Sequence, residues 1–281
     1  MSEENGFADL HVHSSCSDGL YSVEELMLMA TKKGLRAIAI TDHDSLAGAV
    51  LASQIMSEGK NEVELIPGIE LTSEHRGVEV HILGYFIDHT SKDLQEALEE
   101  MRQQRLKRLN KIIAKLNEHG IPITIDDVLS CVSGESVGRP HIARALVSKG
   151  FATSYIDAFQ RYLRNGAPAY VPRKRMPVAE AIRLIHSARG LAVVAHPCDY
   201  GGFEILHEVI KLGADGVEVL HPRLPRESSE RLMEMAKSLN LLTTGGSDFH
   251  GDEAKSAELG NVAVPYLWVE RLKEYHERFI A

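Results

Sequence analysis

The sequence predicts an α/β protein in which a repeating β/α barrel carries a helical insertion, and three observations support this fold class. Strand-like and helix-like segments alternate from the beginning of the chain, which is typical of parallel β/α units. From about residue 91 to residue 165 the apolar pattern is helical instead. The 281 residues, 44% of them apolar, can bury a large core. We therefore expect the barrel in residues 1–90 and 166–281, and in residues 91–165 an insertion domain that contributes to substrate binding.

The barrel elements follow one another in order. Residues 7–12 predict a first strand and residues 22–34 a helix, with Ser22 as N-cap, Glu25 three residues later and Gly34 at its end. Further strands are expected at 35–42, at 63–70, in a pair formed by 70–75 and 78–86, near 169–171, and at 191–197, 215–220 and 241–248. A second helix is expected from about 46 to 57, and a long amphipathic helix at 92–120 opens the insertion.

Composition and charge restrict the partners and the compartment. A net charge of −9 argues against broad electrostatic binding to nucleic acid or to an anionic membrane, and no extended nucleic-acid surface is evident. No apolar run approaches the roughly 18 residues of a membrane span, and the first residues lack a signal-peptide pattern. The scattered Cys16, Cys131 and Cys198 predict no disulfide framework. We expect a cytoplasmic protein; its oligomeric state is left open.

Histidine and carboxylate residues follow successive predicted strands. They are His11, His13, Asp18, His43, Glu70, His81, His196, Asp248 and His250. The carboxyl ends of parallel barrel strands meet at one rim, so these nine side chains are expected to converge. Residues i and i+2 of a strand share a face, so His11 and His13 can bind one ion together. Any single one of these histidines could equally lie in the core or on the surface, but their joint placement argues for a site.

Six imidazoles and three carboxylates need cations between them, because the carboxylates repel one another and buried polar groups need partners. Imidazole with carboxylate, and no cysteine, suits zinc, manganese or iron. Nine ligands exceed the three or four of one zinc ion. We therefore expect two or three divalent ions, Mn²⁺, Fe²⁺ or Zn²⁺, that share bridging carboxylates.

The motifs around these residues resemble those of one family. "DLHVHSSCSDG", "AITDHD", "PGIE", "HILGY", "AHP" and "GGSDFHG" occur in the order found in the PHP family, named for polymerase and histidinol phosphatase. The resemblance implies a distorted seven-stranded β/α barrel with a trinuclear metal site. "GRPHIARAL" and "YVPRKRMP" in the middle of the chain are similar to the insertion of the stand-alone bacterial subgroup that acts on nucleotides and short oligoribonucleotides.

The same resemblance implies how the ligands are shared among three ions. The first ion would be held by His11, His13, Glu70 and Asp248, the second by Asp18, His43 and His250, and the third by His81, His196 and the bridging Glu70. Every expected ligand is present in this sequence.

Substrate contacts are expected from basic residues in and after the insertion. Arg139 and His141 are candidates to bind a phosphate, although Arg139 could instead pair within the insertion, where the following proline starts a helix. Lys174 and Arg175 form a basic cluster that could bind substrate or simply be solvated. His221, after a barrel strand, is a candidate general acid or phosphate contact.

The predicted function is metal-dependent hydrolysis of a phosphate ester, in which a metal-bridging hydroxide attacks phosphorus. The chain has no G-x-S-x-G elbow, P-loop or Rossmann fingerprint that would point to other chemistry. The expected partner is a small phosphorylated substrate, a nucleoside 3′,5′-bisphosphate, a 5′-mononucleotide or a short oligoribonucleotide. Alternatives are a cyclic phosphate diester hydrolase of small-molecule metabolism, a 5′-3′ exoribonuclease on short RNA, and a non-catalytic metal-binding regulatory module. An amidohydrolase would use a bridging lysine where Glu70 stands.

Overall fold

The computed structural model describes residues 6–59, 62–132, 134, 136–200, 203–251 and 257–280. Its strands are β1 (Phe7–Val12), β2 (Leu35–Ile40), β3 (Glu64–His75), β4 (Val78–Tyr85), β5 (Met176–Pro177), β6 (Leu191–Val194), β7 (Gly216–Leu220), β8 (Leu242–Gly245) and β9 (Val264–Pro265). Its helices are α1 (Val23–Lys32), α2 (Ala47–Ser57), α3 (Lys92–Glu118), α4 (Ile125–Leu129), α5 (Arg139–Ser148), α6 (Tyr155–Ala158), η2 (Phe159–Leu163), α7 (Val178–Ser187), η3 (Pro197–Tyr200), α8 (Phe203–Lys211), α9 (Arg226–Ser238) and α10 (Tyr266–Ile280). Within these ranges, no helix is long and apolar enough to cross a membrane.

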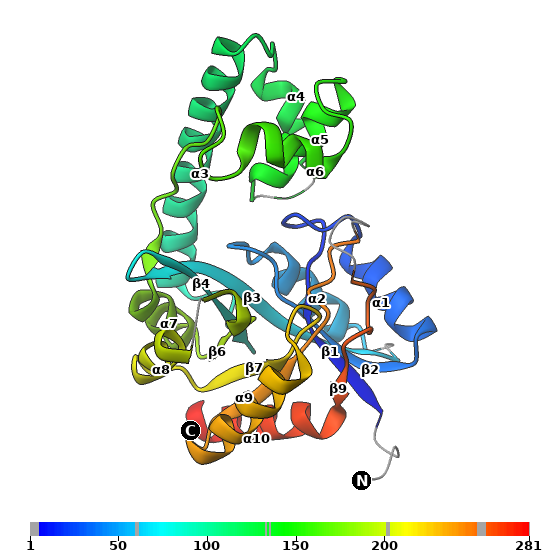
Figure 1. Ribbon diagram of the computed structural model, residues 1–281. Coiled ribbons are helices and arrows are strands. Elements are labelled where there is room, and N and C mark those ends of the chain that lie inside the picture. Colours follow the sequence, from blue (N-terminus) through cyan, green and yellow to red (C-terminus); the bar gives the residue numbers. More distant parts are fainter. Residues whose placement is uncertain are drawn as a thin grey trace.

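One mixed sheet forms the body of the fold (Figure 1). Its seven strands of four or more residues lie in the order β8-β7-β6-β4-β3-β2-β1, and the two-residue strands β9 and β5 pair with β1 and β3. Neighbours are parallel within β1–β2–β3 and β6–β7–β8, whereas β4 is antiparallel to both β3 and β6. The prediction of a distorted seven-stranded β/α barrel is therefore confirmed, and the reversed strand β4 is its distortion.

The sheet is nearly closed because the end of β8 lies against β1. Ser247 donates from its backbone N and its hydroxyl to the Asp9 carboxylate, at 2.9 and 2.6 Å. Gly246 packs so closely against β1 that a Cβ added there would collide with the backbone nitrogen of His11. The first and last long strands thus bring their carboxyl ends to the same place.

Local signals predicted the first helices correctly. Ser22 caps α1 and forms a reciprocal capping box with Glu25, while Gly34 follows the helix with a positive φ of 69°. Helix α2 begins one residue later than expected, and α3 covers nearly all of the predicted amphipathic helix.

Two strand predictions are wrong. Segments 63–70 and 70–75 form one 12-residue strand, β3, so Glu70 lies within a strand rather than at its end. No strand forms at 169–171 in the described chain; the carbonyl oxygens of Tyr170 and Val171 accept bonds from Lys115 Nζ and Arg108 Nε of α3, both at 2.8 Å. Their backbone groups are therefore satisfied by side chains instead of by a neighbouring strand.

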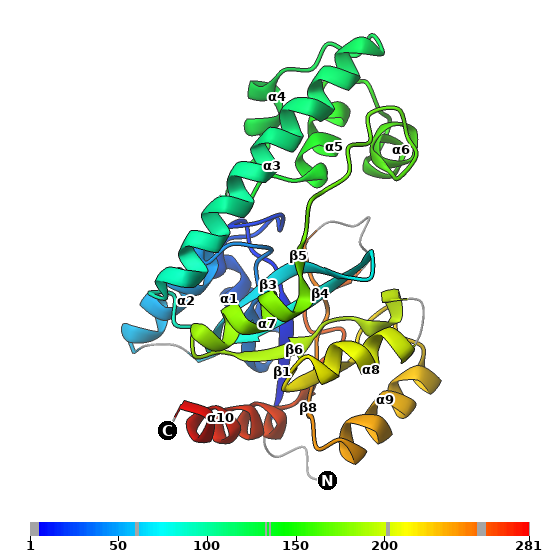
Figure 2. The ribbon, with the colours of Figure 1, turned by 90° about the vertical axis from the view of Figure 1, so that its left-hand side faces the viewer.

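Helix α3 leads away from the barrel, and α4, α5 and α6 gather around its far end before the chain returns through β5 (Figure 2). Near the barrel, Leu94 and Leu98 of α3 join the core beneath α7. Farther along, Leu109 and Leu116 belong to a second apolar cluster made only from residues between 106 and 171. Two separate cores therefore meet along one helix, and the position of the outer core depends on how α3 is held.

Candidate metal centre

The residues that follow β1 and β2 are held by a buried carboxylate. His11 lies in β1 and His13 just after it, with side chains that are fully buried. Asp42 accepts hydrogen bonds from the backbone N of Ser14 at 2.8 Å and from the Ser17 hydroxyl at 2.5 Å. This pairing fixes the loop that leads to Asp18, because both bonds join the ends of two neighbouring strands. Asp42 thus supports the loop that carries Asp18.

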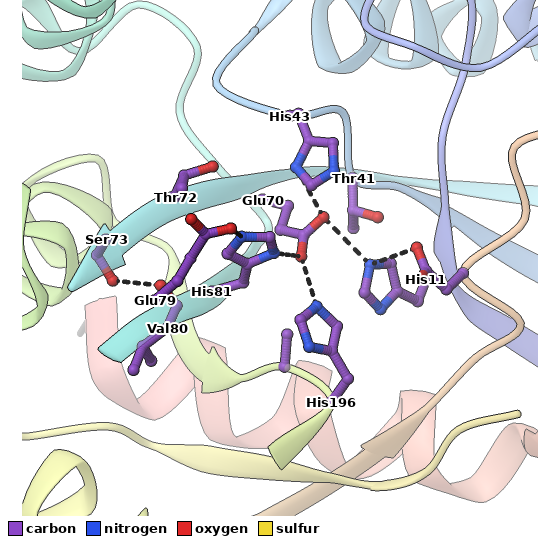
Figure 3. Close-up of polar contacts among 12 residues, drawn as sticks. His11, Thr41, His43, Glu70, Thr72, Ser73, Glu79, Val80, His81 and His196 are labelled. Carbon is purple, nitrogen blue, oxygen red and sulfur yellow. Dashed lines mark hydrogen bonds and ion pairs between the residues drawn. The ribbon is translucent and has the colours of Figure 1, made fainter. Parts of the chain in front are cut away.

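Glu70 lies at the middle of the cluster (Figure 3). Its Oε1 is 2.7 Å from His81 Nδ1 and 3.0 Å from His196 Nε2. Its Oε2 is 3.0 Å from His43 Nδ1, 3.2 Å from His13 Nε2 and 3.4 Å from His11 Nε2. Burial opposes the ionisation of this carboxyl group, but the surrounding imidazoles outweigh it and hold its pKa well below the usual value.

Asp248 and Asp18 are the other two carboxylates of the cluster, and both lie beside His250. Asp248 Oδ1 is 3.2 Å from His13 Nε2, 3.5 Å from His11 Nε2 and 3.6 Å from His250 Nδ1. Asp18 Oδ1 is 3.2 Å from His250 Nε2. All nine residues singled out in the sequence therefore converge, although β4 runs antiparallel and presents His81 from within the strand.

The potential ligand atoms form three groups, and within each group all of the atoms lie within 4.8 Å of one another. They are His11, His13, Glu70 and Asp248; His13, Asp18, His43 and His250; and His43, Glu70 and His81. The groups overlap through His13, His43 and Glu70. His196 stands outside these groups but contacts the same Glu70 oxygen as His81.

The chemistry of this cluster fits bound cations. Buried His11 Nε2, both ring nitrogens of His13 and Glu70 Oε2 make no hydrogen bond, although His11 Nε2 and His13 Nε2 lie 3.4 and 3.2 Å from Glu70 Oε2. Burial lowers the pKa of an imidazole, yet Asp248 and Glu70 outweigh it and raise the pKa of His13 to about 9. Positive charge between the side chains would therefore stabilise these buried carboxylates. Metal ions would supply that charge and would also coordinate the polar atoms that have no hydrogen bond.

A buried glutamate that the sequence reading missed lies behind two of these histidines. Glu218 in β7 is fully buried, and its Oε1 is 3.1 Å from His11 Nδ1. Its Oε2 accepts a hydrogen bond from the backbone N of His196 at 2.6 Å. A charged residue within the apolar run "GVEVL" was the available signal, because an unpaired carboxylate is almost never fully buried.

A cavity of about 450 Å³ opens from the cluster toward the helices of residues 92–163. Asp18, His43 and His81 lie on its metal-centre side, and Arg139 and His141 lie on the helical side. Three aromatic residues that were not singled out, Tyr155, Phe159 and Tyr170, also line it. The cavity therefore joins the ligand cluster to cationic and aromatic side chains, within the usual size range of a small-molecule site.

The predicted substrate residues occupy different surroundings. Arg139 is the first residue of α5, one residue before the expected start. Its guanidinium group donates to Leu163 O within the helical segment, as the alternative expected, and it also lines the cavity. Arg175 lines it too, paired with Glu79. Lys174 is exposed and faces a separate groove beside α3. His221 lies outside the cavity lining, with its Nε2 3.4 Å from Asp248 Oδ2.

A second missed feature ties the helical segment to the barrel. Asp44 is buried beside the cluster, and its Oδ2 accepts bonds from Arg105 of α3 and, at 2.6 Å, from Arg173 of the returning chain. Its Oδ1 accepts the backbone N–H of Thr72 at 2.8 Å. Two guanidinium groups from the two connections of the helical segment therefore share one barrel carboxylate.

Comparisons with other proteins identify the family. A model of the PHP domain matches residues 9–166. A 5′-3′ exoribonuclease of Haemophilus influenzae is 34% identical over 247 residues, which cover 86% of this chain and 89% of that protein. The chain belongs to the PHP family.

Other PHP relatives of similar length carry different activities in their names. A 3′,5′-nucleoside bisphosphate phosphatase of Chromobacterium violaceum is 30% identical over 259 residues, 90% of each chain. A phosphoribosyl 1,2-cyclic phosphate 1,2-diphosphodiesterase of Eggerthella lenta is 28% identical over 260 residues, 90% of this chain and 97% of that protein. A crystal structure from Bifidobacterium adolescentis, assigned as a metal-dependent phosphoesterase, superimposes with a TM-score of 0.86 at 34% identity and covers 94% of both chains.

These likenesses confirm the class predicted from the sequence. The protein is a PHP-family enzyme, a metal-dependent phosphoesterase with a cluster of histidines and carboxylates that can bind metal ions. The non-catalytic alternative is set aside, because the relatives are hydrolytic enzymes and the alignments cover most of the length of each.

Proposed function

We propose that this enzyme removes phosphate from a nucleotide, either a nucleoside 3′,5′-bisphosphate or a 5′-mononucleotide. The observation that carries the proposal is the single cavity that combines ligand residues of the metal centre with Arg139, His141 and aromatic rings. Arginine recognises phosphate through paired N–H donors, and a flat aromatic ring can stack on a nucleobase. Relatives named for nucleotide and RNA substrates support the same substrate class.

We propose three ion sites within the cluster. One would use His11, His13, Glu70 and Asp248; a second Asp18, His43 and His250; and a third His81, His196 and Glu70. Manganese, iron and zinc all suit these imidazole and carboxylate ligands. When bound, such ions lower the pKa of a water molecule toward neutrality and polarise the phosphoryl group.

The protein side chains would bind and orient the substrate. Arg139 uses one guanidinium nitrogen to donate to Leu163 O at 3.3 Å, and the group has five N–H donors in all. Burial lowers the pKa of His141 to about 4, so its ring is neutral at pH 7. His141 Nδ1 accepts from the backbone N of Gly138 at 3.1 Å, which places the ring proton on Nε2, and the backbone of Ser17 is a second hydrogen-bond partner of the ring. His221, facing Asp248, would position that carboxylate.

Glu218→Gln tests the support behind the ligands. We expect Mn²⁺ affinity to fall about 10- to 100-fold, because a carboxylate that orients a ligating imidazole also raises its basicity. Calorimetric Mn²⁺ titration of chelator-stripped protein measures this, with Glu204→Gln, an exposed position on α8, as the matched control. An unchanged affinity in Glu218→Gln would contradict the role of Glu218.

Phosphate release tests the proposed substrate class. Mn²⁺-loaded protein is assayed for free phosphate with adenosine 3′,5′-bisphosphate and 5′-AMP. Chromatography of all products is used for a cyclic ribose phosphate and a 5′-phosphorylated oligoribonucleotide, because hydrolysis of a phosphodiester leaves a monoester and releases no free phosphate. We expect kcat/KM for the bisphosphate or the mononucleotide to exceed that for the cyclic ester at least about tenfold, a difference of about 1.4 kcal/mol in transition-state binding. Turnover confined to the cyclic ester would overturn the nucleotide assignment and favour small-molecule metabolism.

We also propose that the enzyme works in the cytoplasm. The chain has three cysteines, Cys16, Cys131 and Cys198, an odd number that is widely scattered and has no C-x-x-C spacing. So few and scattered cysteines are typical of a protein from a reducing compartment. Fractionation of cells that produce the protein with a small tag would test this, and recovery in the periplasmic or secreted fraction would contradict it.

A further inference from the structure

The loop of residues 13–22, which carries Asp18, consists of turns and bends and contains no helix or strand. The backbone N–H groups of Ser17 and Gly19 both donate to Ser14 O, at 3.1 and 3.0 Å. Neither bond involves the carbonyl group of Asp18, a residue that is buried. A buried carbonyl group needs a hydrogen-bond partner, so this one must be found elsewhere.

That partner comes from the helical segment of residues 92–163, on the side of the barrel that the loop faces (Figure 1). Arg144, in the middle of α5, donates from Nη2 to Asp18 O at 2.7 Å, across 126 residues of chain. The Asp18 carboxylate remains directed at the cluster, with Oδ1 3.2 Å from His250 Nε2. One charged donor therefore holds the backbone of a residue whose side chain faces the metal centre.

Two other residues of the helical segment contact the same loop. The His141 ring is buried and has the backbone of Ser17 as a hydrogen-bond partner. Gly134 packs so closely on the loop that a Cβ added there would collide with the carbonyl group of Cys16. Three consecutive residues of the loop are therefore each contacted by a different residue of the helical segment.

Arg144 acts on the loop without facing the substrate cavity. Among the described residues that line the cavity of the metal centre are Asp18 and His141, but not Arg144. Removal of its guanidinium group would leave the Asp18 carbonyl group without this bond, and a buried acceptor that loses its donor favours another loop conformation. Any effect on the site is therefore expected through Asp18 and not through a lost substrate contact.

We propose that Arg144 is a positioning residue of the metal centre, which fixes the Asp18 carboxylate for the second ion by holding the Asp18 backbone. The inference rests on the proposed assignment of Asp18, His43 and His250 to that ion. A ligand that is already ordered binds more tightly, because less freedom is lost on binding. The helical segment would thus complete a metal site in addition to binding substrate.

The test compares Arg144→Met, which keeps an apolar stem and removes the donors, with Asp18→Asn and with the double variant. Calorimetric Mn²⁺ titration of chelator-stripped protein gives the affinity of each ion, and kcat and KM for 5′-AMP are measured at increasing Mn²⁺. Hydrogen exchange of the metal-free chain reports on residues 13–22 directly. The control is Arg164→Met, because exposed Arg164 of the same segment also donates to a backbone carbonyl, Gln160 O at 3.0 Å.

In Arg144→Met we expect one Mn²⁺ ion to bind about tenfold more weakly, as for other groups that orient metal ligands. Turnover should recover at saturating Mn²⁺ with KM unchanged, and the amides of residues 13–22 should exchange faster in the metal-free chain. Asp18→Asn should weaken the same ion, and the double variant should weaken it no further, because Arg144 acts through Asp18. Arg164→Met should match the unmodified chain in every measurement.

Unchanged Mn²⁺ affinity and unchanged hydrogen exchange in Arg144→Met would overturn the proposal. A further loss of affinity when Arg144→Met is added to Asp18→Asn would also overturn it, because the two residues would then act independently. Absence of Mn²⁺ binding by the unmodified chain would instead overturn the proposed metal sites.

Discussion

Asp248→Asn is expected to lower phosphate release about a thousandfold while the chain stays folded. The Asp248 carboxylate faces His11, His13 and His250, and its loss removes an anionic ligand of the proposed first ion. Lewis-acid stabilisation by a metal is worth several kcal/mol, and about 1.4 kcal/mol corresponds to each factor of ten in rate. The measurement is kcat with saturating Mn²⁺, with circular dichroism to check folding.

The control for this variant is Asp93→Asn, a change of the same kind at an exposed position in the first turn of α3. It should keep turnover within about twofold, because surface substitutions away from special features have small effects. Full activity in Asp248→Asn, with the metal content of the unmodified protein, would contradict the assignment of Asp248 to the metal centre.

Asp44→Asn should reduce the free energy of unfolding by about 3 to 5 kcal/mol. The Asp44 side chain is 1% exposed and pairs with Arg105 and Arg173, which are 14% and 15% exposed. Breaking a buried pair leaves uncompensated charge, in this case two guanidinium groups that face each other. These arginines also line the cavity, so KM for a nucleotide should rise in the same variant.

Urea denaturation of Asp44→Asn beside Glu99→Gln measures the stability effect. Glu99 pairs with Arg102 on the exposed face of α3, where an ion pair contributes at most about 1 kcal/mol. We expect a clear shift of the midpoint in Asp44→Asn only. Equal midpoints for the two variants would show that the Asp44 network does not hold the helical segment on the barrel.

The sequence predicts the parts of this protein that depend on local pattern. Strand period, the capping box at Ser22 and the His11–His13 spacing are each set within a few residues, and the structure keeps all three. Convergence of the nine polar residues also follows from sequence, because strand order in a barrel decides where strand ends meet. Long-range geometry then refines the arrangement: β3 runs through Glu70 instead of ending there.

Features that depend on distant pairs could not be read from the sequence. Arg105 and Asp44 are separated by 61 residues, and no local pattern links them. Lys174 and Arg175 are neighbours in sequence, yet only Arg175 reaches the metal-centre cavity while Lys174 faces the groove. Glu218 is different, because a buried acidic residue in an apolar strand could have been flagged from sequence alone.

We expect bound divalent ions in the nine-residue cluster to drive phosphate ester hydrolysis. The most direct test is to titrate chelator-stripped protein with Mn²⁺ while measuring bound metal and phosphate release in the same samples. We expect no turnover without metal, and turnover that rises as two or three ions bind to each chain. Undiminished turnover in protein that contains no bound metal would contradict it.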